Sequence, residues 1–260
     1  MKNPQILYRF IPWESALKTF DSENLKLGRI DSLNDPFELL PAFPESSSNL
    51  LAWHAQHDIM RSVFQEHYGL LCFAEKELIF QPEMWSRYAD HHRGVALGFE
   101  IVEEEKNDKK NCYLNHAENF RESLPPVHLV RCPKENERIE IPEIEELVNS
   151  PTDSHGELIQ RFLKKGRNGG VEDLLTRKGY GWRHEKEWRC VCQLDCDSFI
   201  YRNGSYFFSL NNLRISELVL GWKNTSDRTE IEKINHKWGA VVKKMKPTAK
   251  RYKLEVDHQF

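Results

Sequence analysis

A short aromatic segment that runs directly into an apolar one constrains this chain most: residues 83–100, EMWSRYADHHRGVALGFE. At 3.6 residues per turn, Trp85, Tyr88, Ala89 and His92 fall on one helical face, which is therefore mainly aromatic. Pro82 favours a helix start and Gly94 a helix end. After Gly94, larger apolar residues alternate with smaller ones as in a half-buried strand, at Val95, Leu97 and Phe99. The pattern predicts an aromatic helix that feeds a core strand.

A second segment, residues 180–192 (YGWRHEKEWRCVC), is the expected partner of the first. If it is extended, its charged side chains fall on one side: Glu185, Glu187 and Arg189. The other side then carries Trp188, Cys190 and Cys192. We expect the apolar side to pack in the core, and Trp85, Phe99 and Trp188 to be core residues.

Apolar periodicity predicts the remaining elements. Strands are expected at residues 6–10, 25–30, 68–74, 127–132, 206–210, 215–221 and 240–244. Helices are expected at residues 14–20, 49–67, 142–149, 154–165 and 227–238. Polar or turn-rich composition predicts loops at residues 31–38, 103–111 and 164–170. No repeat or long linker divides the chain, so we expect one domain over residues 1–260.

Composition narrows the class of protein. The 37 basic and 40 acidic residues give a formal net charge of −3, which provides no global attraction to nucleic acid or to an anionic membrane. No apolar run approaches the roughly 20 residues of a membrane helix, so no membrane partner is expected. The six cysteines form no CxxC pair and the chain starts without an apolar signal run. A reduced, cytoplasmic protein is the simplest interpretation.

Several common catalytic motifs are absent from the sequence. Eleven histidines occur, but there is neither an HExxH motif nor a paired CxxC, so no metal site is expected. The phosphate loops GxGxxG and GxxxxGK[ST] are also missing, and no serine stands in a GxSxG context.

What remains is a set of polar residues in strongly apolar surroundings: Arg9, Asn34, Asp35, Tyr88, Glu187 and Arg189. A structural role explains each of them singly. Arg9, for example, alternates with core residues on its strand, where an arginine often forms a structural ion pair. Together they are harder to explain structurally, because four separate segments each contribute to the set.

At these residues the chain resembles a large bacterial family of unknown function allied to the AbiGi abortive-infection proteins. The matching motifs are LYRF (residues 7–10), LNDPFE (33–38), CFAE (72–75), MWSRYADHHRGVALGFE (84–100) and EKEWR (185–189). That family is similar to divergent ADP-ribosyltransferases. The resemblance implies an α+β fold with a split, mostly antiparallel sheet and peripheral helices. It also implies NAD as the cofactor, consumed as a substrate.

The resemblance further implies roles for single residues. Arg9 would hold the NAD pyrophosphate or ribose as a forked donor. Tyr88 would stack on the nicotinamide, whereas helical spacing turns Ser86 of the same motif away from it. Glu187 would be catalytic and stabilise positive charge as the glycosidic bond breaks. Spacing does not distinguish it from Glu185. The remaining members of the polar set, Asn34, Asp35 and Arg189, would complete the cofactor site.

The sequence therefore predicts an NAD-dependent ADP-ribosyltransferase that acts as a toxin or phage-defence effector on a nucleic-acid or protein acceptor, with an antitoxin as a candidate partner. The first alternative is a noncatalytic nucleotide- or partner-binding module in which Arg9 and Glu187 form only a structural ion pair. The second is a nuclease effector of abortive infection.

Overall fold

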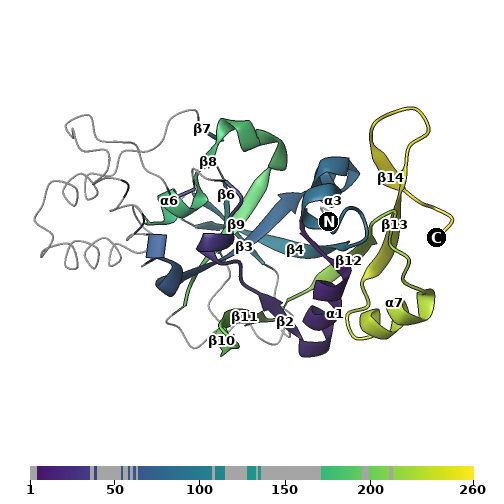
Figure 1. Ribbon diagram of the computed structural model, residues 1–260, viewed down its shortest axis with the longest axis horizontal. Coiled ribbons are helices and arrows are strands. Elements are labelled where there is room, and N and C mark those ends of the chain that lie inside the picture. Colours follow the sequence, from purple (N-terminus) through teal and green to yellow (C-terminus); the bar gives the residue numbers. More distant parts are fainter. Residues whose placement is uncertain are drawn as a thin grey trace, which may run out of the picture.

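The computed structural model is a mixed α and β structure whose largest sheet is mostly antiparallel (Figure 1). It describes residues 5–35, 38–39, 54, 58, 61–62, 64–106, 109–114, 128–132, 134–135, 171–194, 199–210 and 213–260. The expectations for helices at residues 142–149 and 154–165 and for a loop at 164–170 lie outside these residues. Of the helix expected at 49–67, the described residues 54, 58, 61–62 and 64–67 are helical.

Strands dominate the described residues. They are β1 (Gln5–Ile11), β2 (Asn24–Lys26), β3 (Tyr68–Glu75), β4 (Val95–Lys106), β5 (Lys109–Leu114), β6 (His128–Arg131), β7 (Lys134–Glu135), β8 (Lys178–Gly179), β9 (Glu187–Gln193), β10 (Phe199–Arg202), β11 (Ser205–Ser209), β12 (Ile215–Leu220), β13 (Val241–Pro247) and β14 (Leu254–Val256). The helices are α1 (Trp13–Ser22), α3 (Pro82–Tyr88), α6 (Val171–Thr176) and α7 (Arg228–Asn235), with 3-10 turns η1 (Ile30–Ser32), η2 (Lys76–Phe80) and η5 (Tyr180–Glu185).

The main sheet closes partly on itself. Its strand order is β1-β3-β9-β6-β5-β4-β12-β13-β14, and β1 also pairs with β4. The strands from β1 to β4 in this order therefore form a ring of antiparallel pairs, and β12, β13 and β14 extend from β4. A mostly antiparallel sheet with a few helices was predicted; the barrel-like closure was not. Closure places β1 beside β3, and β3 beside β9.

The two sides of the main sheet carry two apolar clusters. On β1, Leu7 and Ile11 belong to the larger cluster, whereas Tyr8 and Phe10 belong to the smaller. The predicted core positions are confirmed: Phe99 lies in the larger cluster, Trp188 packs against it half-buried, and Trp85 is fully buried in the smaller one. Alternation along each strand thus predicted the direction of its side chains correctly.

Four local predictions were wrong. In the charged run at 103–111, the described residues 103–106 and 109–111 do not form a loop, because they pair as the antiparallel strands β4 and β5. Tertiary pairing outweighs the low strand propensity of such residues. The strand expected at 25–30 ends at Lys26, and the chain then turns through η1. Residues 180–185 form η5 rather than an extended segment. The aromatic helix ends at Tyr88, before a tight turn with positive φ at residues 90–92.

Candidate functional site

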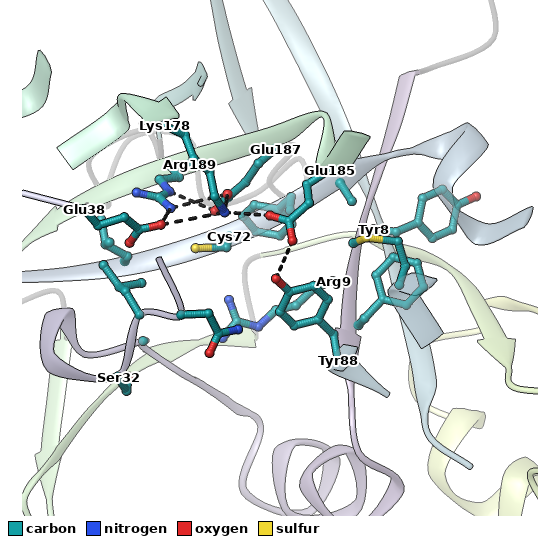
Figure 2. A pocket seen from close by; sticks show the side chains of 18 residues that line it. Tyr8, Arg9, Ser32, Glu38, Cys72, Tyr88, Lys178, Glu185, Glu187 and Arg189 are labelled. Carbon is teal, nitrogen blue, oxygen red and sulfur yellow. Dashed lines mark hydrogen bonds and ion pairs between the residues drawn. The ribbon is translucent and has the colours of Figure 1, made fainter. Parts of the chain in front are cut away.

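The polar residues singled out in the sequence gather around a pocket of about 280 Å³ (Figure 2). Strands β1, β3 and β9, helix α3 and the chain after β2 build it. Its polar lining consists of Tyr8, Arg9, Ser32, Asn34, Glu38, Cys72, Tyr88, Lys178, Glu185, Glu187 and Arg189. Its apolar lining includes Phe10, Leu70, Phe73 and Met84. This volume is at the lower end of the range for small-molecule sites, which is roughly 300–1,000 Å³.

Arg9 is a cation in this pocket without an acidic partner in the described part of the chain. Its Nη2 donates to the Lys26 carbonyl oxygen at 3.0 Å, and its buried Nε has no hydrogen-bond partner among the described residues. No carboxylate of the described residues forms an ion pair with it, and burial lowers the pKa of this guanidinium. The structural ion pair with Glu187, considered as the alternative role of Arg9, is therefore absent. A buried donor that lacks a partner is a site where an anionic ligand can bind.

Glu187 instead pairs with two other cations. Arg189 Nε donates to its Oε1 at 2.8 Å, and Lys178 Nζ donates to its Oε2 at 2.6 Å. Burial alone would raise the pKa of Glu187, but the charges of Arg189 and Lys178 outweigh burial and hold it well below its usual range. The carboxylate is therefore ionised, and much of its charge is offset by its neighbours.

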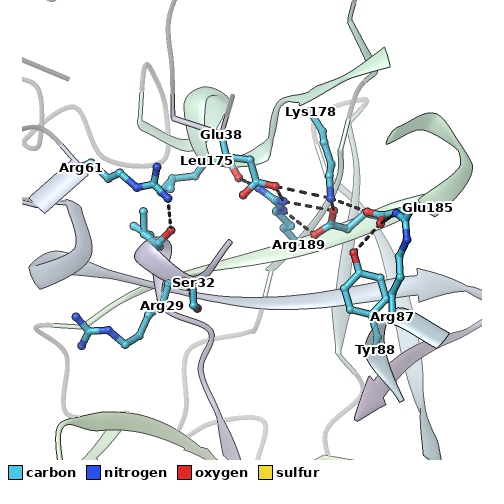
Figure 3. Close-up of polar contacts among 12 residues, drawn as sticks. Arg29, Ser32, Glu38, Arg61, Arg87, Tyr88, Leu175, Lys178, Glu185 and Arg189 are labelled. Atoms are coloured by element: carbon cyan, nitrogen blue, oxygen red, sulfur yellow. Dashed lines mark hydrogen bonds and ion pairs between the residues drawn. The ribbon is translucent and has the colours of Figure 1, made fainter. Parts of the chain in front are cut away.

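Glu185 joins the same network from the end of η5. Its Oε2 accepts from Lys178 Nζ at 2.6 Å, and its Oε1 accepts from the Tyr88 hydroxyl at 2.6 Å (Figure 3). Arg87 Nη1 lies 3.6 Å from the same Oε1. Lys186, between the two glutamates, has φ 40° and turns the chain so that both side chains reach Lys178. Glu185 and Glu187 thus meet at one lysine, although they are not on one strand as predicted.

Two residues of the network were not predicted from the sequence. Lys178 is nearly buried and contacts three carboxylates, and Glu38 accepts from Arg189 Nη2 at 2.6 Å. Glu38 is the last residue of the LNDPFE motif. The motif was identified in the sequence, but no role was predicted for Glu38. Lys178 stands in no recognised pattern. The buried network holds three carboxylates and two cations, a formal charge of −1.

Cys72 lies between Arg9 and the network (Figure 2). Burial raises the pKa of its thiol, and the nearby Glu187 charge adds to this effect. A thiol that resists ionisation is a poor nucleophile, so we assign Cys72 no covalent role.

Five of the six residues predicted for the site line the pocket: Arg9, Asn34, Tyr88, Glu187 and Arg189. Asp35 does not line it and is buried beside it, near Gly179. Ser86 is exposed on the far face of α3, as its helical spacing predicted. In the described part of the chain, no group of three or more His, Cys, Asp or Glu side chains is arranged to hold a metal ion.

A family model described as a protein of unknown function (DUF2971) matches residues 84–190, so a DUF2971 domain is present there. No curated protein and no solved structure matches the chain. Among the described residues, no helix combines the length and apolar character needed to span a membrane. The matched region includes most of α3, Lys178 and the first half of β9, but not β1 or β3, which contribute Arg9 and Cys72.

Proposed function

We propose that this pocket binds NAD and that the protein transfers ADP-ribose to a nucleic-acid or protein acceptor, as a cytoplasmic toxin or phage-defence effector. The proposal includes a divergent ADP-ribosyltransferase fold and kinship with the AbiGi proteins. One observation carries it: the Arg9 guanidinium, whose Nε has no hydrogen-bond partner among the described residues, lies in the same pocket as Tyr88 and a buried carboxylate network. These are the groups needed to hold a pyrophosphate, stack a nicotinamide and stabilise a cationic ribose.

In the proposed reaction, the bond between the ribose C1 atom and the nicotinamide nitrogen breaks, and nicotinamide leaves with the bonding electron pair. Positive charge then develops on the ribose, and a carboxylate of the pocket stabilises it. A preorganised contact of this kind is worth about 10²- to 10³-fold in rate. An oxygen or nitrogen of the acceptor forms the new bond to C1 and releases its proton to solvent.

Glu187 and Glu185 are both candidates for the charge-stabilising carboxylate. Glu187 accepts hydrogen bonds from two cations, whereas Glu185 accepts from one cation and the Tyr88 hydroxyl. Lys178 is shared, so removing either glutamate leaves more of the lysine charge to offset the charge of the other. We keep Glu187 as the proposed catalytic residue and use Glu185 as its matched comparison.

A noncatalytic nucleotide-binding module is the second candidate function. The pairing of Glu187 with Arg189 and Lys178 favours it, because a neutralised carboxylate stabilises a cation less well. In this module Arg9 would bind a phosphate, and the network would only hold β9 and the chain around Glu38 together.

The experiment that separates the two functions is label transfer. The wild-type protein is incubated with NAD labelled in its adenine portion and with RNA, DNA or cell lysate. The transferase proposal predicts free nicotinamide and label in one class of acceptor. NAD that is bound but recovered unchanged, with every acceptor tested, would favour the binding module instead.

A further inference from the structure

We propose that Glu38 is a specificity-determining residue of this pocket: its second carboxylate oxygen accepts a hydrogen bond from an O–H or N–H group of the ligand whose anionic group Arg9 binds. The choice of NAD as the probe ligand rests on the proposed function. The role of Glu38 itself rests on the two polar atoms described next.

Glu38 has one occupied and one free oxygen. Its side chain is 3% exposed and lines the pocket. Oε1 accepts from Arg189 Nη2 at 2.6 Å and lies 3.7 Å from Lys178 Nζ. Oε2 is buried and has no hydrogen-bond partner among the described residues. Buried acceptors are rarely left unpaired, because the lost interaction with water is not replaced.

Arg189 fixes which oxygen is free. Its guanidinium is held in turn by Glu187 and by the Leu175 carbonyl oxygen, to which Nη1 donates at 2.7 Å. An arginine anchored by several partners cannot follow a moving carboxylate, so Glu38 keeps one orientation. Its Oε2 is therefore preorganised to accept a hydrogen bond from a molecule that enters the pocket.

Arg9 provides the complementary free atom. Its Nε is a buried donor without a partner in the described part of the chain, and Arg9 lines the same pocket. A ligand that satisfies both atoms must bring an anion to Arg9 and an O–H or N–H donor to Glu38. A nucleotide meets this requirement with its phosphates and sugar hydroxyls. Inorganic pyrophosphate supplies the anion alone, and a carboxylate near Glu38 would be repelled.

The other role that Glu38 could have is to balance the charge of Arg189. That role needs only Oε1 and predicts nothing about ligands. The substitution Glu38→Gln distinguishes the two roles. The amide oxygen keeps the hydrogen bond from Arg189, and the amide NH₂ takes the place of Oε2. The substitution thus preserves the Arg189 contact and turns the free acceptor into a donor.

The test is a calorimetric titration of NAD and of inorganic pyrophosphate into the wild-type protein, Glu38→Gln and Arg9→Met. Arg9→Met is expected to weaken the binding of both NAD and pyrophosphate. Glu38→Gln is expected to weaken NAD binding by about 10- to 100-fold, because an N–H donor replaces the oxygen that would accept from the ligand. Pyrophosphate should bind Glu38→Gln at least as tightly as wild type. Glu77→Gln, a substitution of an exposed glutamate outside the pocket, serves as the matched control and should change neither titration.

Equal NAD affinity in the wild-type protein and Glu38→Gln would overturn the inference, and so would an equal loss for both ligands. If Glu38→Gln does not fold, Glu38→Asp keeps the charge and withdraws the oxygen from the pocket by one methylene, with the same expected pattern. Wild-type protein that binds NAD with this pattern but releases no nicotinamide would contradict the proposed function alone. Wild-type protein that does not bind NAD would overturn both.

Discussion

Two arginines of one pocket, Arg9 and Arg189, differ in what surrounds them. Arg189 donates hydrogen bonds to Glu187, to Glu38 and to a backbone carbonyl oxygen. Arg9 donates to one carbonyl oxygen, and its Nε has no partner among the described residues. The family resemblance implied cofactor binding for both arginines, and each alternates with apolar residues along its strand. The partner of a charged residue comes from another segment, so periodicity cannot tell a structural arginine from a ligand-binding one.

Lys178 is predicted to stabilise the fold because it forms ion pairs with both Glu185 and Glu187 and so offsets the repulsion between them. Its pKa is raised: burial lowers it, but the carboxylates, Glu187 foremost, outweigh burial. Removing one partner of a buried ion pair typically costs about 3–5 kcal/mol. We therefore expect Lys178→Met to lose stability of this order at pH 7, measured by urea denaturation.

The pH dependence of this loss follows from Glu187. The pKa of Glu187 is depressed in the fold, so its stabilising contribution is present above the unfolded value of about 4.3 and is lost as pH falls toward the folded value. Without Lys178, the pKa of Glu187 is lowered by less. The deficit of Lys178→Met should therefore be largest at neutral pH and smaller near pH 3. Lys186→Met, which removes a partly exposed ion pair, is the control, with an expected loss under about 1 kcal/mol. A deficit that does not change with pH would show that charge is not the cause.

At the scale of elements, the connection from α3 to β4 shows what a local pattern can and cannot predict. The helix start at Pro82 and the buried strand after Gly94 were both predicted correctly. The helix end was not, because three consecutive non-glycine residues with positive φ carry no recognisable signal. Gly94 was interpreted as a helix end, but it is required by close packing. A Cβ atom there would lie 2.2 Å from the carbonyl oxygen of Ile11 on β1.

Gly94→Ala is accordingly expected to destabilise the protein. The backbone of β1 cannot yield as a flexible side chain could, and overpacking in a closely packed region typically costs about 1–3 kcal/mol. Gly181→Ala is the matched control, because a Cβ atom at Gly181 has no neighbour within 4 Å. Urea denaturation of the two variants checks this prediction. A midpoint for Gly94→Ala as high as that of Gly181→Ala would show that β1 and β4 can separate without cost.

At the scale of the whole molecule, the site depends on which strands meet. Most strands could be predicted from apolar alternation, but the closure of β1 onto both β3 and β4 could not, because strand pairing is non-local. That closure carries Arg9 into the same pocket as Glu187, and it explains why a motif set spread over residues 7–189 forms one site. Glu38 and Lys178 were missed for the same reason, since their partners lie on other segments.

The central claim is that a carboxylate of this pocket accelerates the cleavage of NAD. The most direct measurement compares nicotinamide release, NAD affinity and thermal stability in the wild-type protein, Glu187→Gln and Glu185→Gln. Each substitution keeps the shape of the side chain and removes a charge next to Lys178. Glu187→Gln also removes the charge paired with Arg189, so it should lose more stability than Glu185→Gln, and turnover is compared at a temperature where both variants are folded.

We predict that Glu187→Gln lowers kcat by about 10²- to 10³-fold while the Kd for NAD changes little, because the charge matters more in the transition state than in bound NAD. Glu185→Gln should keep most of the turnover. Loss confined to Glu185→Gln would move the catalytic role to that residue. Wild-type turnover in both variants, or no nicotinamide release by the wild-type protein with any acceptor, would contradict the claim.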